Sequence, residues 1–517
     1  MNNVISFTKQ TLLIAFFTVF FFCVNGQNNK DQFPDPKIKA GIAKISGSIS
    51  NLKLSKEEKK VIIAVWVSNP VTAEESKYET NLNKNNQFSI NIPLECSTAI
   101  CGFTVVTETN SYGACIIGLE QDKKLQMNIV FDDKGDIKID VKEGLNLTFN
   151  DMMNLLKARE RFEDLYNWGD FHKMTPKEFA EYELTINLKK RINSTIDSLI
   201  LAKKSKKHLT NEFNLEYLSG PLFSYKEMAE RSFKNRKKEN LQSTAYTAIE
   251  PDKSYYSFLR QFNLNNPQYL YCYFYAKFMR RFLSIAAFKI PEIKNQPIDE
   301  WLRGVKATVQ DMVGFNSGLF YDMLAASAYA RQFNDERNPL TNKQVENIKK
   351  YYKNRNEEIA KILLKKNEEI IKIVESNNDL KVNATPAVAK EKLIDTIIAK
   401  YKGRVVLVDF WATWCGPCVK TMENMKPLKA ELKDKGVVFV YLSNSSSPKP
   451  LWEGKIKAIG GEQYYFKADE WEYVMNSFGF ESIPSYLIYD KNGILKHKFT
   501  SYPSTDKMRK MIEELLP

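Results

Sequence analysis

The first part of the chain alternates short apolar runs with polar turns, which is typical of β-strands joined by tight connections. The run Gln87–Ile92 shows this most clearly, because apolar and polar side chains alternate as they do in a half-solvated strand. We therefore predict a β-sandwich-like, antiparallel domain over residues 38–145. Its predicted strands are Ala43–Ile49, Val61–Val67, Gln87–Ile92, Gly102–Thr107, Leu125–Val130 and Asp136–Val141.

The middle of the chain changes to the apolar spacing of three and four residues that indicates helices. Between Glu183 and Leu201, aliphatic side chains fall on one stripe, which predicts an amphipathic helix. Residues Thr341–Ser376 show the same spacing among many charges and predict one long helix. We predict an α-helical domain over residues 147–380, with the aromatic-rich segment Tyr255–Phe288 in its core.

The last part of the chain alternates apolar strands with helices, which predicts an α/β domain over residues 385–517. Val405–Phe410 and Val437–Leu442 are continuous apolar runs, as expected for strands that are covered on both faces. Lys390–Tyr401 is predicted to be a helix ahead of the first of these strands. The segment Asn377–Ala389 is interpreted as the linker from the helical domain.

The first residues have the pattern of a secretory signal. Lys9 precedes the apolar run Leu12–Val24, and Val24-Asn25-Gly26 offers a cleavage point. We predict a signal peptide over residues 1–26, a mature chain that starts at Gln27, and a periplasmic or cell-envelope location. The apolar run is short for a membrane span, which needs about 20 residues, but an uncleaved membrane anchor stays open.

A Cys-Gly-Pro-Cys sequence follows the first strand of the α/β domain. Gly416 and Pro417 separate Cys415 from Cys418, and helical apolar spacing begins directly after them. This order places Cys415 at a helix N-terminus, where free N–H groups and the helix dipole favour a thiolate. Cys415 is the predicted nucleophile, and Cys418 is the predicted resolving thiol of a redox-active disulfide.

Two other interpretations of this pair stay open. A Cys-x-x-Cys can be half of a zinc site, but His172, His208 and His497 form no ligand-like pair. A purely structural disulfide is also possible, although it does not explain the two tryptophans, Trp411 and Trp414, just ahead of the cysteines. We predict neither a metal nor a cofactor.

Residues 385–517 resemble the thioredoxin fold, and in particular the TlpA/ResA group of exported bacterial thioredoxin-like proteins. Besides the cysteines, Ser482-Ile483-Pro484-Ser485 carries the resemblance. It implies that Pro484 is a cis-proline facing the cysteines and that the backbone of Ile483 meets a substrate strand. It also implies that Asp409 is a buried carboxylate that takes a proton from the resolving thiol.

The resemblance also implies a substrate-contact surface formed by Trp414, Gly416 and Pro417 beside Ile483. The chain departs from the family pattern at Thr421 and Glu423, where many relatives have an acidic residue and a proline. The usual helix kink is therefore expected to be absent or to move to Pro427, and Glu423 is a candidate substitute for the acidic residue. The N-terminal β domain resembles the one in front of many Bacteroidetes-type TlpA-like proteins.

The other cysteines and the charge change the picture less. Cys96, Cys101 and Cys115 lie close in the sequence, and two of them are expected to form a bridge in an oxidising compartment. Cys272 lies in an aromatic run and is expected to be a buried, inert thiol. The net charge of +13 is carried mainly on helices such as the one around Lys203–Lys207. A solvated face explains it, and weak attraction to anionic lipid or acidic partners is the alternative.

We predict from these patterns an exported thiol–disulfide oxidoreductase that reduces protein disulfides, with disulfide-containing client proteins and a membrane electron donor as partners, and no nucleic acid. Reduction is favoured over oxidation because the Gly-Pro pair between the cysteines matches that of thioredoxin. The alternative is a partner- or glycan-binding surface protein in which the thioredoxin-like end is accessory. A peroxidase is a third interpretation, which the second cysteine disfavours. The sequence leaves the oligomeric state open.

Overall fold

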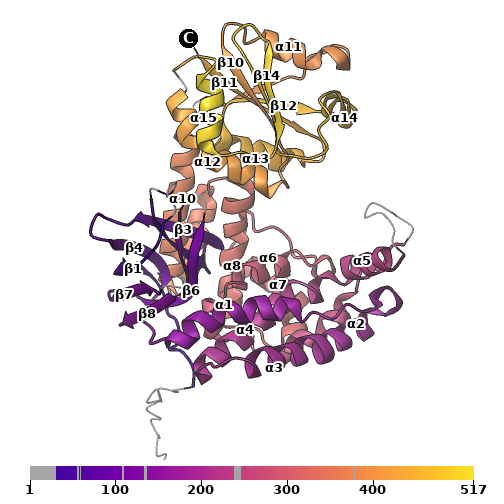
Figure 1. Ribbon diagram of the computed structural model, residues 1–517. Coiled ribbons are helices and arrows are strands. Elements are labelled where there is room, and N and C mark those ends of the chain that lie inside the picture. The colour runs from indigo at the N-terminus through magenta and orange to yellow at the C-terminus, as the bar shows by residue number, and fades with distance from the viewer. Residues whose placement is uncertain are drawn as a thin grey trace, which may run out of the picture.

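The computed structural model describes residues 31–516 apart from 55–57, 59, 108–109, 133–136, 238–245, 377–378 and 433. The predicted signal peptide, residues 1–26, and the predicted start at Gln27 lie outside the described residues. Over the described part of the chain, no helix has both the length and the apolar character that crossing a membrane requires. Figure 1 shows β-sheets beside a helical body, with an α/β domain above them.

Two four-stranded sheets form the N-terminal domain. Their strand orders are β4-β1-β7-β8 and β3-β2-β5-β6, and their inner faces contribute to one hydrophobic core. The prediction of a sandwich-like antiparallel domain needs one correction, because β1 and β7 pair in parallel and the first sheet is mixed. The strands are β1 (Ile38–Ser50), β2 (Ile62–Asn69), β3 (Glu74–Asn81), β4 (Gln87–Cys96), β5 (Thr98–Val106), β6 (Ser111–Glu120), β7 (Lys124–Phe131) and β8 (Ile137–Lys142).

The middle of the chain is helical, as predicted. Its α-helices are α1 (Phe149–Asp164), α2 (Pro176–Tyr182), α3 (Lys189–Asp197), α4 (Lys203–Ser219), α5 (Tyr225–Lys237), α6 (Tyr275–Leu283), α7 (Ile298–Val313), α8 (Leu319–Arg331), α9 (Asn342–Tyr352) and α10 (Glu357–Ser376). Two π-helical segments, η2 (Glu183–Leu188) and η7 (Gln332–Glu336), continue α2 and α8.

The single long helix predicted over Thr341–Ser376 is wrong. The chain leaves the helical conformation between α9 and α10, where the side chain of Asn356 accepts a hydrogen bond from the amide of Glu358. An asparagine in this position satisfies a free N–H group at the start of a new helix. The apolar spacing continues across the break, so periodicity alone does not reveal it.

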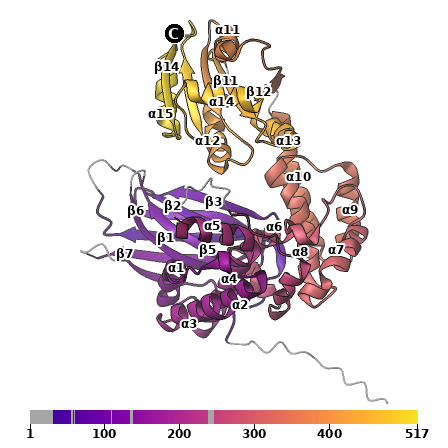
Figure 2. The ribbon, with the colours of Figure 1, turned by 90° about the vertical axis from the view of Figure 1, so that its right-hand side faces the viewer.

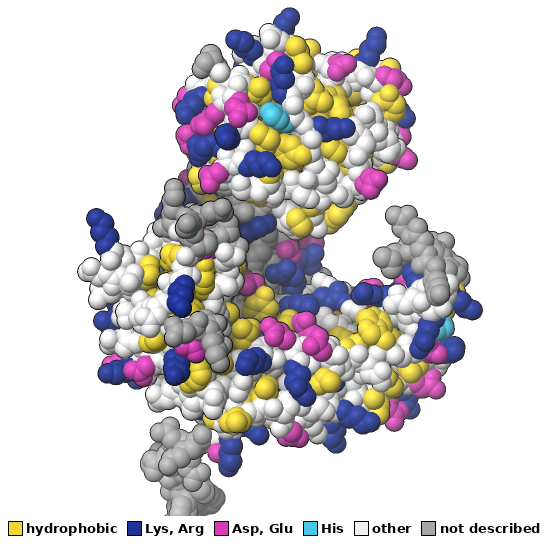
Figure 3. Space-filling view, viewed as in Figure 1, with side chains coloured by type: hydrophobic (Ala, Val, Ile, Leu, Met, Phe, Trp, Pro, Cys, Tyr) yellow, Lys and Arg dark blue, Asp and Glu magenta, His cyan; other side chains and the backbone are white. Residues whose placement is uncertain are grey.

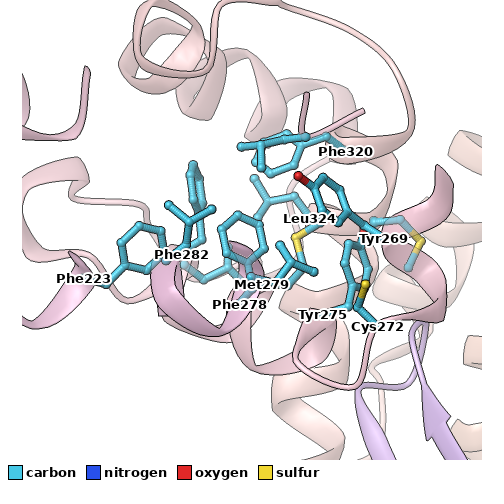
Figure 4. Close-up of a cluster of buried hydrophobic side chains, with 14 of the residues drawn as sticks. Phe223, Tyr269, Cys272, Tyr275, Phe278, Met279, Phe282, Phe320 and Leu324 are labelled. Atoms are coloured by element: carbon cyan, nitrogen blue, oxygen red, sulfur yellow. The ribbon is translucent and has the colours of Figure 1, made fainter. Parts of the chain in front are cut away.

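The helical core is rich in aromatic side chains from the predicted segment Tyr255–Phe288. Figure 4 shows α6 residues Tyr275, Phe278, Met279 and Phe282 packed with Phe320 and other side chains. The same core includes four side chains of the β domain, Ile38, Val71, Cys96 and Ile116. The two N-terminal domains therefore share buried apolar surface, which is the main driving force for keeping them together.

The C-terminal domain is a six-stranded sheet between two layers of helices. Its strand order is β14-β13-β10-β11-β12-β9, with α12, α13 and α15 packed on one face and α11 and α14 on the other. The elements are β9 (Lys381–Asn383), α11 (Leu393–Ala399), β10 (Val405–Phe410), α12 (Gly416–Leu432), β11 (Val437–Asn444), α13 (Lys449–Ile459), β12 (Glu462–Phe466), α14 (Ala468–Ser477), β13 (Ser485–Tyr489), β14 (Leu495–Thr500) and α15 (Thr505–Glu513).

The predicted linker contains the edge strand of this sheet. Lys381–Asn383 pairs in parallel with β12 as β9, and the Lys381 amide donates to the carbonyl of Gly461. A three-residue strand has almost no apolar signal of its own, so only its long-range pairing identifies it. Figure 2 shows the C-terminal domain above the other two, with α10 rising toward it.

Candidate active site

The central strand β10 delivers the cysteine pair to one edge of the C-terminal sheet. All six of its residues are buried, and it lies between β11, to which it is parallel, and β13, to which it is antiparallel. A strand that is covered on both faces needs apolar side chains throughout, which explains the Val405–Phe410 pattern. The chain then passes through Trp411–Cys415 and enters α12 at Gly416.

Cys415 directly precedes α12 and has the position of a helix cap. The backbone amide of Cys418 lies 3.2 Å from the Cys415 Sγ and points at it, while Pro417 has no N–H group to offer. Cys415 and Cys418 form a disulfide. In the reduced protein, this amide and the helix dipole would stabilise a Cys415 thiolate over the thiol.

The two cysteine sulfurs differ in their exposure to solvent. Hydrogen bonds from a neighbouring loop hold the segment just before the cysteines in place. Cys415 is 4% exposed, whereas Cys418 is completely buried. The neighbouring Trp414 is 64% exposed, and its indole N–H donates to the hydroxyl of Ser446 over 3.0 Å. The hydroxyl of Ser447 accepts from the Thr413 amide. Neither serine was predicted from the sequence, although the polar run after β11 marks a loop.

The loop before β13 brings a backbone carbonyl to the cysteines. The peptide between Ile483 and Pro484 is cis, as the resemblance implied. The Cys415 Sγ lies 3.9 Å from the carbonyl oxygen of Ile483. Cys415, Cys418, Trp414 and Ile483 thus meet at one end of the sheet, around an exposed indole that a second molecule can contact.

Asp409 lies on β10 inside the domain. It is 2% exposed, and its Oδ1 has no hydrogen-bond partner among the described residues. Its register neighbours on the adjacent strands are Tyr441 and Tyr486. Burial in this apolar setting raises the pKa of the Asp409 carboxyl well above its usual value. A buried carboxyl of this kind is able to hold a proton at neutral pH, and its predicted transfer to or from Cys418 stays a prediction.

The residues at which the chain departs from the family pattern have other surroundings in the structure. Glu423, the candidate acidic residue, forms an ion pair with Arg337 of the helical domain. Thr421 is buried, and Pro427 lies inside α12, which runs unbroken from Gly416 to Leu432. The contact with Arg337, which is 86 residues away in the sequence, carries no local signal that could have predicted it.

The bridge expected among the N-terminal cysteines is absent from the structure. Cys96, Cys101, Cys115 and Cys272 are free and buried. Burial raises the pKa of Cys101 and of Cys115 to about 12, and it raises that of Cys96 further. Cys96 packs into the helical core and is thereby separated from Cys101 and Cys115, which both face the sandwich core from neighbouring strands and are free thiols. Cys272 is buried, as expected.

Comparisons with known proteins cover the C-terminal part of the chain. Residues 377–516 match the Redoxin family model. The C-terminal part of the chain is a redoxin domain. It is related to the thiol–disulfide oxidoreductases called ResA: the protein of Geobacillus thermodenitrificans is 28% identical over 120 residues, which cover 23% of this chain and 68% of that protein. The ResA protein of Bacillus anthracis is 23% identical over 116 residues, which cover 22% and 66%.

Solved structures match the same part of the chain. The thioredoxin domain of a thiol–disulfide oxidoreductase from Bacteroides vulgatus is 22% identical, with a TM-score of 0.21, and the match covers 23% of this chain and 84% of that one. The family model and the ResA relatives show that the redoxin domain is a thiol–disulfide oxidoreductase domain, and its Cys-x-x-Cys pair is Cys415 and Cys418.

Proposed function

We propose that this protein is exported from the cytoplasm and reduces disulfides of client proteins through Cys415. The observation that carries the proposal is the position of the Cys415 sulfur at the start of α12, where the Cys418 amide points at it. The exposed Trp414 beside it supports a role in binding a second protein, since a large apolar side chain in water gains most by being covered.

The exchange would proceed in two balanced steps. The Cys415 thiolate attacks one sulfur of a client disulfide and releases the other client sulfur as a thiolate. The Cys418 thiol then loses its proton, attacks the Cys415 sulfur, and releases the second client sulfur. The client gains two electrons and leaves as two thiolates, which take protons from water according to their own pKa, and the enzyme is left as the Cys415–Cys418 disulfide. Asp409 is the proposed acceptor of the Cys418 proton, because a buried carboxylate with an unpartnered oxygen gains by protonation.

The direction of the reaction can be tested by the reduction potential of the pair. The Gly416-Pro417 sequence favours a reducing couple, because the same pair occurs in thioredoxin, whose potential is about −270 mV. Equilibration of the Cys415–Cys418 couple with glutathione buffers should give a value in that range. A value near −120 mV, about that of a strong oxidant, would contradict the reductase form.

Client binding can be tested by trapping. Replacing Cys418 with Ala removes the sulfur that resolves the mixed disulfide, so clients should remain attached to Cys415. The matched control is the double variant that also carries Cys415→Ser, which has no nucleophile. If cells that make the single variant accumulate no more disulfide-linked protein than those with the control, the proposal fails.

Export and the electron donor are separate parts of the proposal. The apolar run Leu12–Val24 supports a secretory signal, and an exported reductase needs electrons from a membrane protein that reaches the cytoplasmic pool. Sequencing the N-terminus of the protein purified from the cell envelope should give Gln27 as the first residue. An intact Met1 on protein recovered from the cytoplasm would contradict export.

A further inference from the structure

A short π-helical segment of the helical domain contacts both helices that begin at the redox site. Arg337, the residue directly after η7, forms an ion pair with Glu423 of α12. The carbonyl oxygen of Glu336 lies so close to Gly454 of α13 that an added Cβ there would be 2.6 Å from it. Asn338 accepts a hydrogen bond from Lys457 of α13. The helical domain is therefore docked against α12 and α13 at fixed points along both helices.

These contacts place the redox site close to the helical domain. Glu423 is eight residues after Cys415, which corresponds to about 12 Å along a helix. Val419, one turn after Cys415, lines the same small cavity as Arg337. Residues four apart lie on one face of a helix, so the helical domain approaches α12 on the side that carries Cys415. A client that reaches Cys415 must therefore fit beside the helical domain.

The surface next to the contact between the helical domain and α12 forms a basic hollow. Figure 3 shows it between the redoxin domain and the helical body, with Lys and Arg side chains along its floor. In Figures 1 and 2, α6 lies below α13 at this place. Lys277 and Arg280 are exposed on α6 and three residues apart, and thus on the same face. Burial lowers the pKa of Lys455 on α13, and the charges of Arg337 and, to a smaller extent, Arg280 act in the same direction against those of Asp335 and Glu423, which agrees with the place of α6 below α13.

The acidic side chains where the helical domain meets α12 and α13 already interact with nearby cations. Glu423 is paired with Arg337 and lies 3.9 Å from the amine of Lys420, and the Asp335 charge acts on Lys455. Among the described residues, Arg280 makes no ion pair with a carboxylate. Lys277 lies over the ring of Phe274 and its charge acts on Glu216, so Arg280 is the cation of α6 that has no carboxylate partner among the described residues.

We propose that the redox site takes clients as extended, acidic segments, with the disulfide at Cys415 and carboxylates of the segment along Lys277 and Arg280 of α6. The inference rests on the proposed function. An extended segment fits where a compact protein would collide with the helical domain. Opposite charges on the two surfaces raise the association rate and favour this partner over a basic one.

The test uses two synthetic peptides of equal length that contain the same intramolecular disulfide. One carries four glutamates next to its cysteines, and the other carries four lysines. The full-length protein is first reduced to the dithiol and freed of reductant, and its second-order rate with each peptide is measured by separating reduced from oxidised peptide. At low salt we expect the acidic peptide to react about five- to tenfold faster, and the preference to shrink in about 0.5 M salt.

The deciding variant is Lys277→Glu combined with Arg280→Glu, which should abolish or reverse the preference. Lys189→Glu combined with Lys190→Glu on α3, at the far side of the helical domain from α13 in Figures 1 and 2, is the charge-matched control and should keep the preference. Equal rates for both peptides, or an unchanged preference in the variant of Lys277 and Arg280, would overturn the inference. The uncharged reagent 2,2′-dithiodipyridine separates the two hypotheses, because a reduced protein that reacts with neither it nor the peptides has no active thiol and the proposed function fails.

Discussion

The redoxin domain and the two N-terminal domains contain the same reactive groups in opposite settings. The Cys415 sulfur stands at a helix N-terminus beside an exposed indole. Cys101 and Cys115 lie in strands inside the sandwich core, where burial raises the pKa of both thiols to about 12. The place of a thiol in the fold therefore decides whether it takes part in thiol–disulfide exchange or only packs in the core. Three pairs of variants, each with one member in either region, and one alkylation experiment test this comparison.

The largest effect is expected from replacing single cysteines. Cys415→Ser should lower the rate of peptide disulfide reduction by at least about a thousandfold, because no other thiolate can start the exchange. Cys115→Ser should leave that rate unchanged. It should instead lower the free energy of unfolding by about 1–3 kcal/mol, because it buries a hydroxyl in an apolar core. Loss of activity in the Cys115 variant at full stability would break the comparison.

Alkylation of the reduced protein sharpens the same contrast. The helix N-terminus favours the thiolate of the reduced Cys415, whereas a pKa of about 12 leaves Cys101 with a negligible thiolate fraction at pH 7.5. Iodoacetamide should therefore modify Cys415 more than about a thousandfold faster than Cys101 or Cys115. Mass spectrometry of time points gives the rates, and unfolding in guanidinium should make all thiols react alike. Comparable rates in the native protein would remove the physical basis of the proposed activity.

Buried carboxyls in the two regions should change stability with pH in the same direction but differ in their effect on disulfide exchange. Glu95 of the β domain accepts hydrogen bonds from the Val71 and Thr72 amides, yet burial raises its pKa from 4.5 to about 7. A carboxyl with a raised pKa in the folded state stabilises the fold below its unfolded pKa. That contribution falls as the pH rises through about 7, by as much as about 3 kcal/mol. Glu95→Gln should flatten this part of the stability–pH curve.

Asp409 has the same sign of shift but a different consequence. Burial raises its pKa, so Asp409→Asn should increase the free energy of unfolding at pH 8, and the increase should shrink as the pH falls toward the unfolded pKa of about 4. Unlike Glu95→Gln, this variant should also slow the release of trapped clients, because the Cys418 proton loses its acceptor. Denaturant titrations at pH 5 and pH 8 and a single-turnover assay check both points. A stabilised variant with normal release would make Asp409 a structural residue only.

Two helix glycines give the smallest expected effects. Gly454→Ala places a Cβ 2.6 Å from the Glu336 carbonyl oxygen, whereas nothing lies within 4 Å of a Cβ at Gly304 in α7. Gly304→Ala should stabilise the protein by about 0.5–1 kcal/mol through helix propensity. Gly454→Ala should instead cost about 1–3 kcal/mol of contact energy where the helical domain meets α13, so that the redoxin domain melts separately in calorimetry. Equal stabilisation by both changes would show that the domains are not held together here.

The sequence predicted the local parts of the active site well, because each has a strong signal of its own. The apolar run Val405–Phe410 followed by two cysteines specifies strand, turn and helix without any distant contact. The class of each domain also followed from periodicity. By contrast, β3 has polar side chains at nearly every position and none that is buried, so an edge strand of this kind gives no apolar pattern to detect.

The features that the sequence did not predict have a weak local signal or depend on contacts between distant segments. The break between α9 and α10 rests on one asparagine within a continuous apolar pattern. The pairing of Arg337 with Glu423 and the separation of Cys96 from Cys101 depend on how whole domains pack. Proximity in sequence predicted neither that Cys96 packs into another core than Cys101 and Cys115 nor that the latter two, which share a core, stay free thiols.

The edge strand β9 determines where the redoxin domain can be cut free. A fragment that begins at residue 385, the border suggested by sequence pattern, lacks Lys381–Asn383 and leaves the backbone of β12 bare along one side. Bare strand edges recruit other chains. Such a fragment should aggregate or dimerise. A fragment that begins a few residues before Lys381 keeps β9 as the edge strand that covers β12.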